Sequence, residues 1–152
     1  MENLPPILKN LHLDNCNYKK INNFPQYLEL LKCSDEFYFR QTNIPSTLKK
    51  LVITQSGIIP GDNLLADSNI LPENLEELYF DYETDYEITN SDLLKLNYFI
   101  KIFNNLPNRL KILKIPSFWN EPLINLPGSL QKLYIGSKYN QQLDFLPESI
   151  KS

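Results

Sequence analysis

The stretch IPSTLKKLVI (residues 44–53) decides the fold, because its pattern recurs through a chain of 152 residues. The other copies are LPPILKNLHL (4–13), FPQYLELLKC (24–33), LPENLEELYF (71–80), LPNRLKILKI (106–115), LPGSLQKLYI (126–135) and the shortened LPESIKS (146–152). Each copy opens with an apolar residue and a proline, and successive prolines are 20, 20, 27, 35, 20 and 20 residues apart. A period near twenty is typical of a solenoid.

The pattern within one repeat predicts a turn followed by a short strand. Each site is numbered here by its distance from the proline of its repeat, so that +3 is three residues after it. Sites +3, +6 and +8 are apolar in all six full copies, and the alternation at +6 and +8 is that of a half-buried strand. Proline cannot donate to a sheet ladder, so it belongs in the turn before the strand. The predicted strands are 10–14, 30–34, 50–54, 77–81, 112–116 and 132–136.

A single repeat cannot bury its apolar edge, whereas stacked repeats share one continuous core. The prediction is therefore an α/β solenoid: a curved parallel sheet with mostly irregular convex segments and one convex helix. It is expected to form a single domain over 1–152, with six full repeats and a truncated seventh. Chance richness in leucine does not account for seven prolines in one register.

The two long repeats are expected to carry insertions. Residues 56–69 are rich in Gly, Pro, Asn and Asp and predict a loop. In the 35-residue repeat, Ser91 is a candidate N-cap for a helix over about 91–104 that covers the return segment of the fourth repeat. The apolar residues at helical spacing are Leu93, Leu96, Ile100 and Phe103.

The strand pattern resembles that of leucine-rich repeats, and the return segments narrow the resemblance. The phrases WNEPL (119–123) and YNQQL (139–143) resemble the Asn-containing phrase of FNIP-type leucine-rich repeats, with Asn120 and Asn140 at the matching position. The second repeat has Tyr38 there instead, so the resemblance predicts no continuous asparagine ladder. It implies strands lining the inside of a curve. Related repeats accompany F-box segments in ubiquitin-ligase adaptors.

Composition and charge exclude several classes of function. The net charge of −3 argues against nucleic-acid binding, and no apolar run is long enough for a membrane. With no secretory leader and only Cys16 and Cys33, the expected compartment is the cytoplasm, or the host cytoplasm for a viral protein. The acidic stretch 81–92 imitates a calcium loop but has Tyr86 where the sharp turn needs glycine. No metal or cofactor is predicted.

The candidate binding residues are the outward side chains at site +7. Aromatic, basic and apolar side chains in one row suit a protein contact, and the sequence offers no cluster of nucleophile and base. The prediction is a non-catalytic protein-interaction module. The alternatives are an enzyme with an unrecognised site, or a substrate-recognition fragment of a ubiquitin-ligase adaptor. The first and sixth strands carry no evident cap, which predicts either a homo-oligomer through the open solenoid ends or descent from a longer repeat array. The candidate residues are His12, Lys32, Val52, Tyr79, Lys114 and Tyr134.

Overall fold

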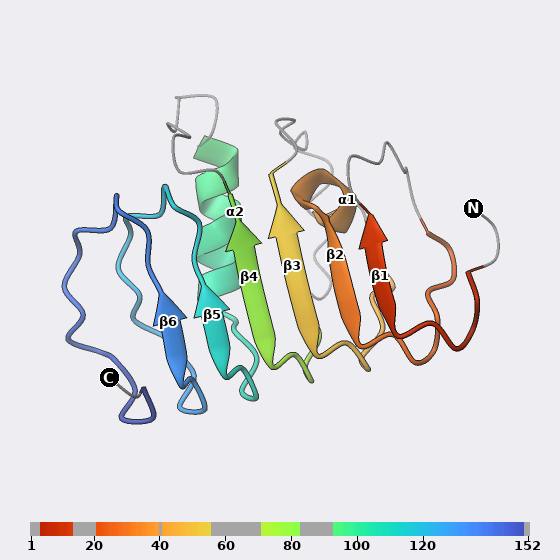
Figure 1. Ribbon diagram of the computed structural model, residues 1–152. Helices are drawn as coiled ribbons and strands as arrows, with labels where there is room; N and C mark the ends of the chain where they lie inside the picture. Colours follow the sequence, from red (N-terminus) through yellow and green to blue (C-terminus); the bar gives the residue numbers. More distant parts are fainter. Residues whose placement is uncertain (1–3, 14–20, 40, 56–70, 83–92, 151–152) are drawn as a thin grey trace.

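The computed structural model describes residues 4–13, 21–39, 41–55, 71–82 and 93–150, without the side chains of 93–95. Its centre is a six-stranded parallel sheet whose strands lie side by side in sequence order (Figure 1). The sheet, with few helices, is compatible with a curved repeat fold. The strands are β1 (Asn10–Leu13), β2 (Leu30–Ser34), β3 (Lys50–Thr54), β4 (Glu77–Asp81), β5 (Ile112–Lys114) and β6 (Lys132–Tyr134).

The register of the sheet follows the prolines, as predicted. Leu11, Leu31, Leu51, Leu78, Leu113 and Leu133, all at site +6, are paired in one line across the ladder. Every strand lies within two residues of its predicted bounds, although β5 and β6 end two residues early. At the end of β5, Pro116 has no N–H to continue the ladder with β4.

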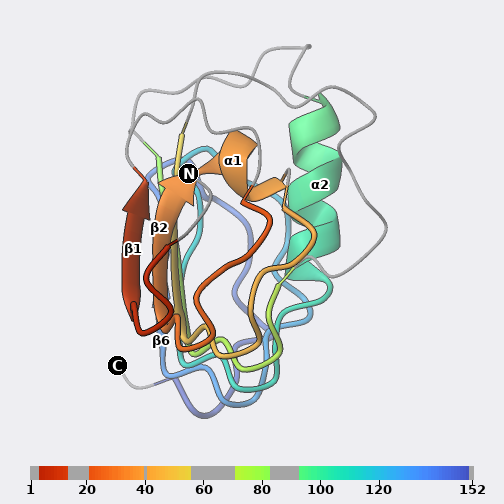
Figure 2. The same cartoon turned by 90° about the vertical axis from the view of Figure 1, so that its right-hand side faces the viewer.

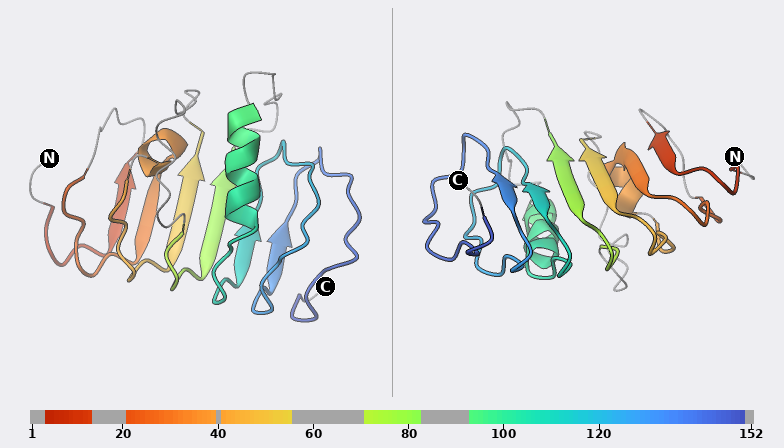
Figure 3. Two further views of the ribbon diagram at one scale, coloured as in Figure 1. Left: turned by 180° about the vertical axis from the view of Figure 1, so that it is seen from behind. Right: turned by 60° about the horizontal axis from the view of Figure 1, so that its bottom comes forward.

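Each strand is preceded by the same turn. The proline carbonyl accepts a hydrogen bond from the N–H of site +3 at 3.0–3.2 Å. These turns form a row at the end of the sheet where the strands begin (Figure 3). The bond closes a four-residue turn with proline at its first position. The truncated seventh repeat also forms this turn. The donors are Leu8, Leu28, Leu48, Leu75, Leu110, Leu130 and Ile150.

The core lies between the sheet and the return segments, as the side view shows (Figure 2). Side chains at sites +3, +6 and +8 of the middle repeats point into it and are fully buried, including Cys33. Cys33 therefore acts as a small apolar residue, as expected. At the end of the sheet the burial is lost, since Leu133 is only partly buried and Ile135 is 44% exposed.

Two helices lie on the core side of the sheet, where one was predicted (Figure 2). The additional helix is α1 (Asp35–Phe39), in the return segment of the second repeat. Its first turn is capped because Ser34 Oγ accepts the N–H of Phe37 at 3.3 Å. The expectation of a single helix was wrong because a five-residue helix is too short to show a helical period.

The predicted helix is α2 (Leu93–Phe103), and of the expected apolar row Phe103 is buried and Leu96 packs partly against the core. Phe99 and Ile102 are fully buried, while Ile100 is 37% exposed. The ring of Phe99 lies 5.0–6.3 Å from six other aromatic rings, and the four of these that lie outside α2 fix the rotation of the helix. The proposed cap Ser91 lies outside the described residues. The four rings outside α2 belong to Phe80, Tyr82, Phe118 and Trp119.

A buried polar contact links the second and fourth repeats. The carboxylate of Asp35, at the start of α1, is fully buried and accepts the Tyr82 hydroxyl hydrogen at 2.9 Å. Asp35 Oδ1 also accepts the N–H of Glu36 at 2.7 Å. A buried carboxylate needs such hydrogen-bond donors. Without them its burial destabilises the fold by several kcal/mol, on the order of the loss that follows when one partner of a buried ion pair is removed. Tyr82 thus holds α1 against the end of β4.

The face of α2 can be tested with two neighbouring substitutions. Phe99→Ala removes a ring that is 0% exposed and is expected to lower the free energy of unfolding by about 3–5 kcal/mol. Ile100→Ala is expected to cost less than about 1 kcal/mol, because an exposed site loses little burial. Urea denaturation of both variants measures the difference. Equal losses would show that α2 does not present Phe99 to the core.

The two C-terminal repeats are also in close backbone contact, which a pair of glycines tests. A Cβ on Gly136 would lie 2.6 Å from the Cα of Ser117, whereas one on Gly128 would meet nothing within 4 Å. Gly136→Ala is expected to lower the free energy of unfolding by about 1–3 kcal/mol, since backbone cannot yield as a side chain can. Gly128→Ala is the matched control and should change it little. A tolerated Gly136→Ala would mean that these backbones are further apart.

Candidate functional site

The candidate site is the strand face, defined as the side of the sheet that points away from the helices. The strand pairing places the six predicted residues at site +7 consecutively across the ladder. His12 and Tyr134, at the two ends of this row, are exposed, and the four between them are half-buried. Neighbouring strands are about 4.8 Å apart, so the row forms a continuous surface. Its role in binding remains a prediction.

The middle of the strand face holds a compact polar network. Lys50 Nζ lies 2.8 Å from a carboxylate oxygen of Glu77. The same ammonium lies 4.8 Å from the centre of the Tyr79 ring, a cation–π geometry, and the Tyr79 hydroxyl donates to Glu77 at 3.1 Å. Three side chains from two adjacent strands therefore fix one another's positions.

The next strand adds a second ion pair to this surface. Lys114 Nζ lies 2.6 Å from Asp81 Oδ1, with the two side chains 40% and 55% exposed. Pairs this open contribute less than about 1 kcal/mol to stability, so their effect is mainly to hold the side chains in place. Burial raises the pKa of Tyr79 to about 12, and the Glu77 carboxylate adds to the rise. Tyr79 thus stays an uncharged hydrogen-bond donor at neutral pH.

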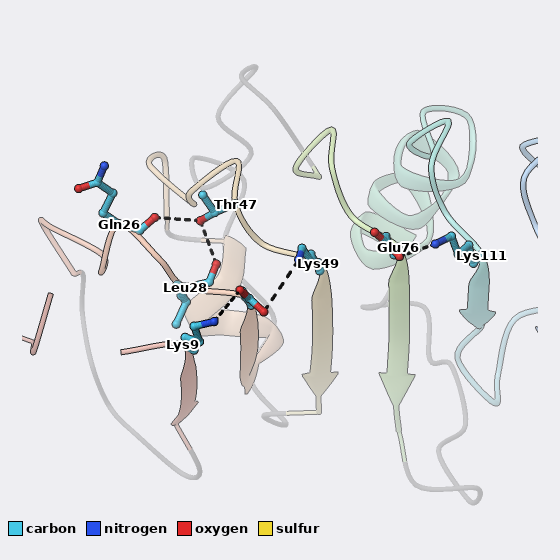
Figure 4. Close-up of polar contacts among 8 residues, drawn as sticks. Lys9, Gln26, Leu28, Thr47, Lys49, Glu76 and Lys111 are labelled. Carbon is cyan, nitrogen blue, oxygen red and sulfur yellow. Dashed lines mark hydrogen bonds and ion pairs between the residues drawn. The ribbon is translucent and has the colours of Figure 1, made fainter. Parts of the chain in front are cut away.

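A second line of charges runs along the start of the strands, at site +4. Glu29 lies between Lys9 and Lys49, 3.2 and 4.0 Å from their ammonium groups, and Glu76 pairs with Lys111 at 2.6 Å (Figure 4). The hydrogen bond from Lys111 lowers the pKa of Glu76. Charges of alternating sign thus stand on neighbouring repeats, which favours the observed order of the strands over one that places like charges together.

Small polar residues at site +2 of four repeats bond the preceding repeat, which sequence reasoning missed. Thr47 Oγ1 donates to the carbonyls of Gln26 and Leu28 at 3.2 and 2.9 Å (Figure 4). Ser129 and Ser149 donate to the carbonyls of Leu110 and Leu130, 19 residues earlier in the chain, at 2.7 and 2.6 Å. The recurrence of Ser and Thr two residues after a proline was the available signal.

Asparagines make further contacts between repeats. Asn120 Oδ1 accepts the backbone N–H of Asn140 at 2.8 Å, so the two predicted asparagines are in contact. Asn125 Nδ2 donates to Asn104 Oδ1 at 3.0 Å, two or three residues before a turn proline. This second contact was missed, although Asn recurs before the prolines in the sequence. These amides stabilise the stack on the side away from the strand face.

The features that bear on chemistry are metal-binding groups, reactive side chains and hollows. The described part of the chain contains no group of three or more His, Cys, Asp or Glu residues able to hold a metal. Burial raises the pKa of the Cys33 thiol, which keeps it unreactive. A hollow of about 470 Å³ lies between the fourth and fifth turns and is lined by Glu73, Asn108 and Arg109 among others, without a nucleophile and base in contact. None of the described helices has the length and apolar character needed to cross a membrane.

The central network predicts a change in tyrosine ionisation. Glu77→Gln removes the carboxylate beside Tyr79 and is expected to lower the pKa of that phenol below its value of about 12. Glu76→Gln is the matched control, since Glu76 pairs with Lys111 instead. Titration of the tyrosine ring carbons by NMR measures both. An unchanged pKa of Tyr79 in Glu77→Gln would show that its hydroxyl does not contact Glu77.

Comparison with known protein families finds a match in the C-terminal part of the chain. The sequence model of the FNIP Repeat matches residues 119–152, less than a quarter of the chain. That stretch includes both Asn120 and Asn140 and the truncated seventh repeat. No curated protein matches the chain. An FNIP repeat, which is leucine-rich-repeat-like, is therefore present at residues 119–152.

Proposed function

We propose that this chain is a non-catalytic protein-interaction module of the leucine-rich-repeat type, which binds a protein partner on its strand face. In this proposal the stacked repeats form a solenoid and the strand face is its concave side. The FNIP repeat at 119–152 suggests an interaction module of the repeat type. Solenoids of this kind use the extended inner surface of the sheet for partners.

The observation that carries the proposal is the fixed central network of Lys50, Glu77 and Tyr79, with Lys114 and Asp81 beside it. Side chains that are already ordered lose less conformational entropy on binding. Tyrosine also supplies a large contact area and a hydroxyl, which is why it is frequent among the residues that dominate binding energy. A surface with these properties suits a protein better than a small molecule.

The charge of the strand face indicates the chemistry of the partner. Among the described residues at sites +5, +7 and +9 there are four lysines but only two carboxylates, Glu77 and Asp81, although the whole chain has a net charge of −3. Basic residues concentrated on one face attract an acidic surface and increase its rate of association. The proposed partner is therefore an acidic protein surface with apolar side chains that contact Val52, Tyr79 and Ile112.

The test compares capture of partners by the wild-type chain and two double variants. Tyr79→Ala with Lys114→Ala removes the centre of the strand face and should weaken binding at least about tenfold, because central aromatic residues typically contribute more than 1 kcal/mol. Affinity capture from the native cell, followed by mass spectrometry, identifies candidates whose affinities are then measured. Binding should also weaken as salt is raised.

The matched control is Tyr27→Ala with Lys138→Ala, which changes the same residue types at exposed sites away from the strand face. Each variant must first show the same melting temperature as the wild-type chain to within a few degrees. Partners lost equally in both double variants do not use the strand face. If every captured protein binds the Tyr79→Ala, Lys114→Ala variant as tightly as the wild-type chain, the proposal is wrong.

A further inference from the structure

The outer edge of β6 carries backbone groups that no described residue bonds. Lys132 N–H donates to the carbonyl of Lys111 at 3.0 Å, and the Tyr134 carbonyl accepts from Ile115 N–H at 3.0 Å. These two residues therefore bond to β5. In a parallel strand alternate residues bond to opposite neighbours, so the N–H and C=O groups of Leu133 and Ile135 face the open edge. β6 is the last strand of the sheet (Figure 1).

Exposed apolar side chains gather at the same end of the molecule. Nine large apolar side chains of the described residues are exposed, and six of them lie between residues 124 and 146. Tyr134 is 49% exposed and Ile135 is 44% exposed, on opposite faces of the same edge. The opposite end differs, because Leu11 and Leu13 of β1 are 7% and 4% exposed. The other exposed residues at the β6 end are Ile124, Leu143, Phe145 and Leu146.

The truncated seventh repeat covers only one part of this end. Ile150 packs against the core and Ser149 Oγ donates to the Leu130 carbonyl at 2.6 Å, so Leu130 is fully buried. Phe145 stands two residues before a turn proline, where five earlier repeats have asparagine, and it is 66% exposed. The site where asparagine bonds a neighbouring repeat is thus apolar in the last one. Ile135, on the same edge, remains 44% exposed.

We propose that a second copy of this chain binds this edge, with the two β6 strands antiparallel about a two-fold axis at Tyr134. The outward backbone groups have the spacing that this pairing needs. In an antiparallel ladder, residues that exchange two hydrogen bonds alternate with a pair that exchanges none. Leu133 bonds the second copy's Ile135, Ile135 bonds the second copy's Leu133, and the two Tyr134 residues face each other on the axis.

Charge and symmetry favour a second copy over other occupants. In this register Lys132 lies opposite the second copy's Gly136, so no lysine of β6 faces another lysine. The apolar residues at the β6 end then meet their own copies, and an isologous contact requires such a self-complementary patch. A contact between β6 and the β1 of another copy would instead place most of the exposed apolar residues against an edge whose leucines are already covered. A two-fold contact uses the same surface on both copies and leaves none of that surface free for a third copy. The product is therefore a dimer and not a filament.

Sedimentation of the full 152-residue chain over a range of concentrations tests the proposal. We expect a concentration-dependent equilibrium between monomer and dimer. Ile135→Pro removes an N–H that points out of the molecule and should weaken the dimer at least about tenfold. Tyr134→Lys places two ammonium groups together on the axis and should have a similar effect. Tyr27→Lys is the control, because Tyr27 is comparably exposed, at 54%, but far from β6.

An engineered disulfide tests the register of the two β6 strands directly. Its readout is the gain of a covalent dimer and not the loss of dimerisation in a variant. In Tyr134→Cys the paired Cα atoms would be about 4.5 Å apart, within the range that a disulfide spans. Oxidation should therefore give a covalent dimer from Tyr134→Cys, and not from Tyr27→Cys or the wild-type chain. A monomer at every concentration, assemblies that grow beyond the dimer, or dimers equally affected by Tyr27→Lys and Tyr134→Lys would each overturn the proposal.

Discussion

The turn closed by the proline carbonyl and the N–H of site +3 is the constraint on which the rest of the structure depends. It occurs seven times with nearly the same length, and it sets where each strand begins. The carbonyl of site +4 then accepts two N–H groups from the next repeat, at 2.7–3.1 Å. Proline contributes by fixing φ at the start of this sequence of bonds. Insertions of seven and fifteen residues are tolerated because they fall in return segments and leave the turn unchanged.

The positions of the strands could be predicted from the sequence because one local pattern determines them. The helices were harder to predict. The existence of α2 followed from its apolar residues, but which face it buries did not, because apolar residues occur on all sides of it. Phe99 is buried in place of Ile100 because its ring contacts aromatic rings from β4 and from the fifth repeat. The sequence of the helix alone contains no information about those neighbours. The short helix α1 depends on Ser34 and on Tyr82, which is 47 residues away from its partner Asp35.

The row of candidate residues was predicted for the same reason as the strands, since alternation assigns each side chain to a face. The contacts within the row were not predicted. Lys50 and Glu77 come from repeats separated by the 27-residue spacing, and Asp81 and Lys114 are separated by the 35-residue spacing. Charge pairs at such unequal distances become visible only once the register is known. The polar residues at site +2 were visible in the sequence but bond backbone carbonyls, which no pattern of side chains reveals.

The bond between Tyr82 and Asp35 has a consequence for how the molecule unfolds. A stack in which each repeat contacts only its neighbours can open from either end, one unit at a time. Tyr82 reaches past the third repeat to the second, and the Phe39 ring lies 4.1 Å from that of Tyr98 in α2. Unfolding of the third repeat alone would therefore also break contacts between the second and fourth repeats. In the monomer, the second to fifth repeats should open in one cooperative step, with slow amide exchange throughout, while the sixth repeat exchanges independently and faster.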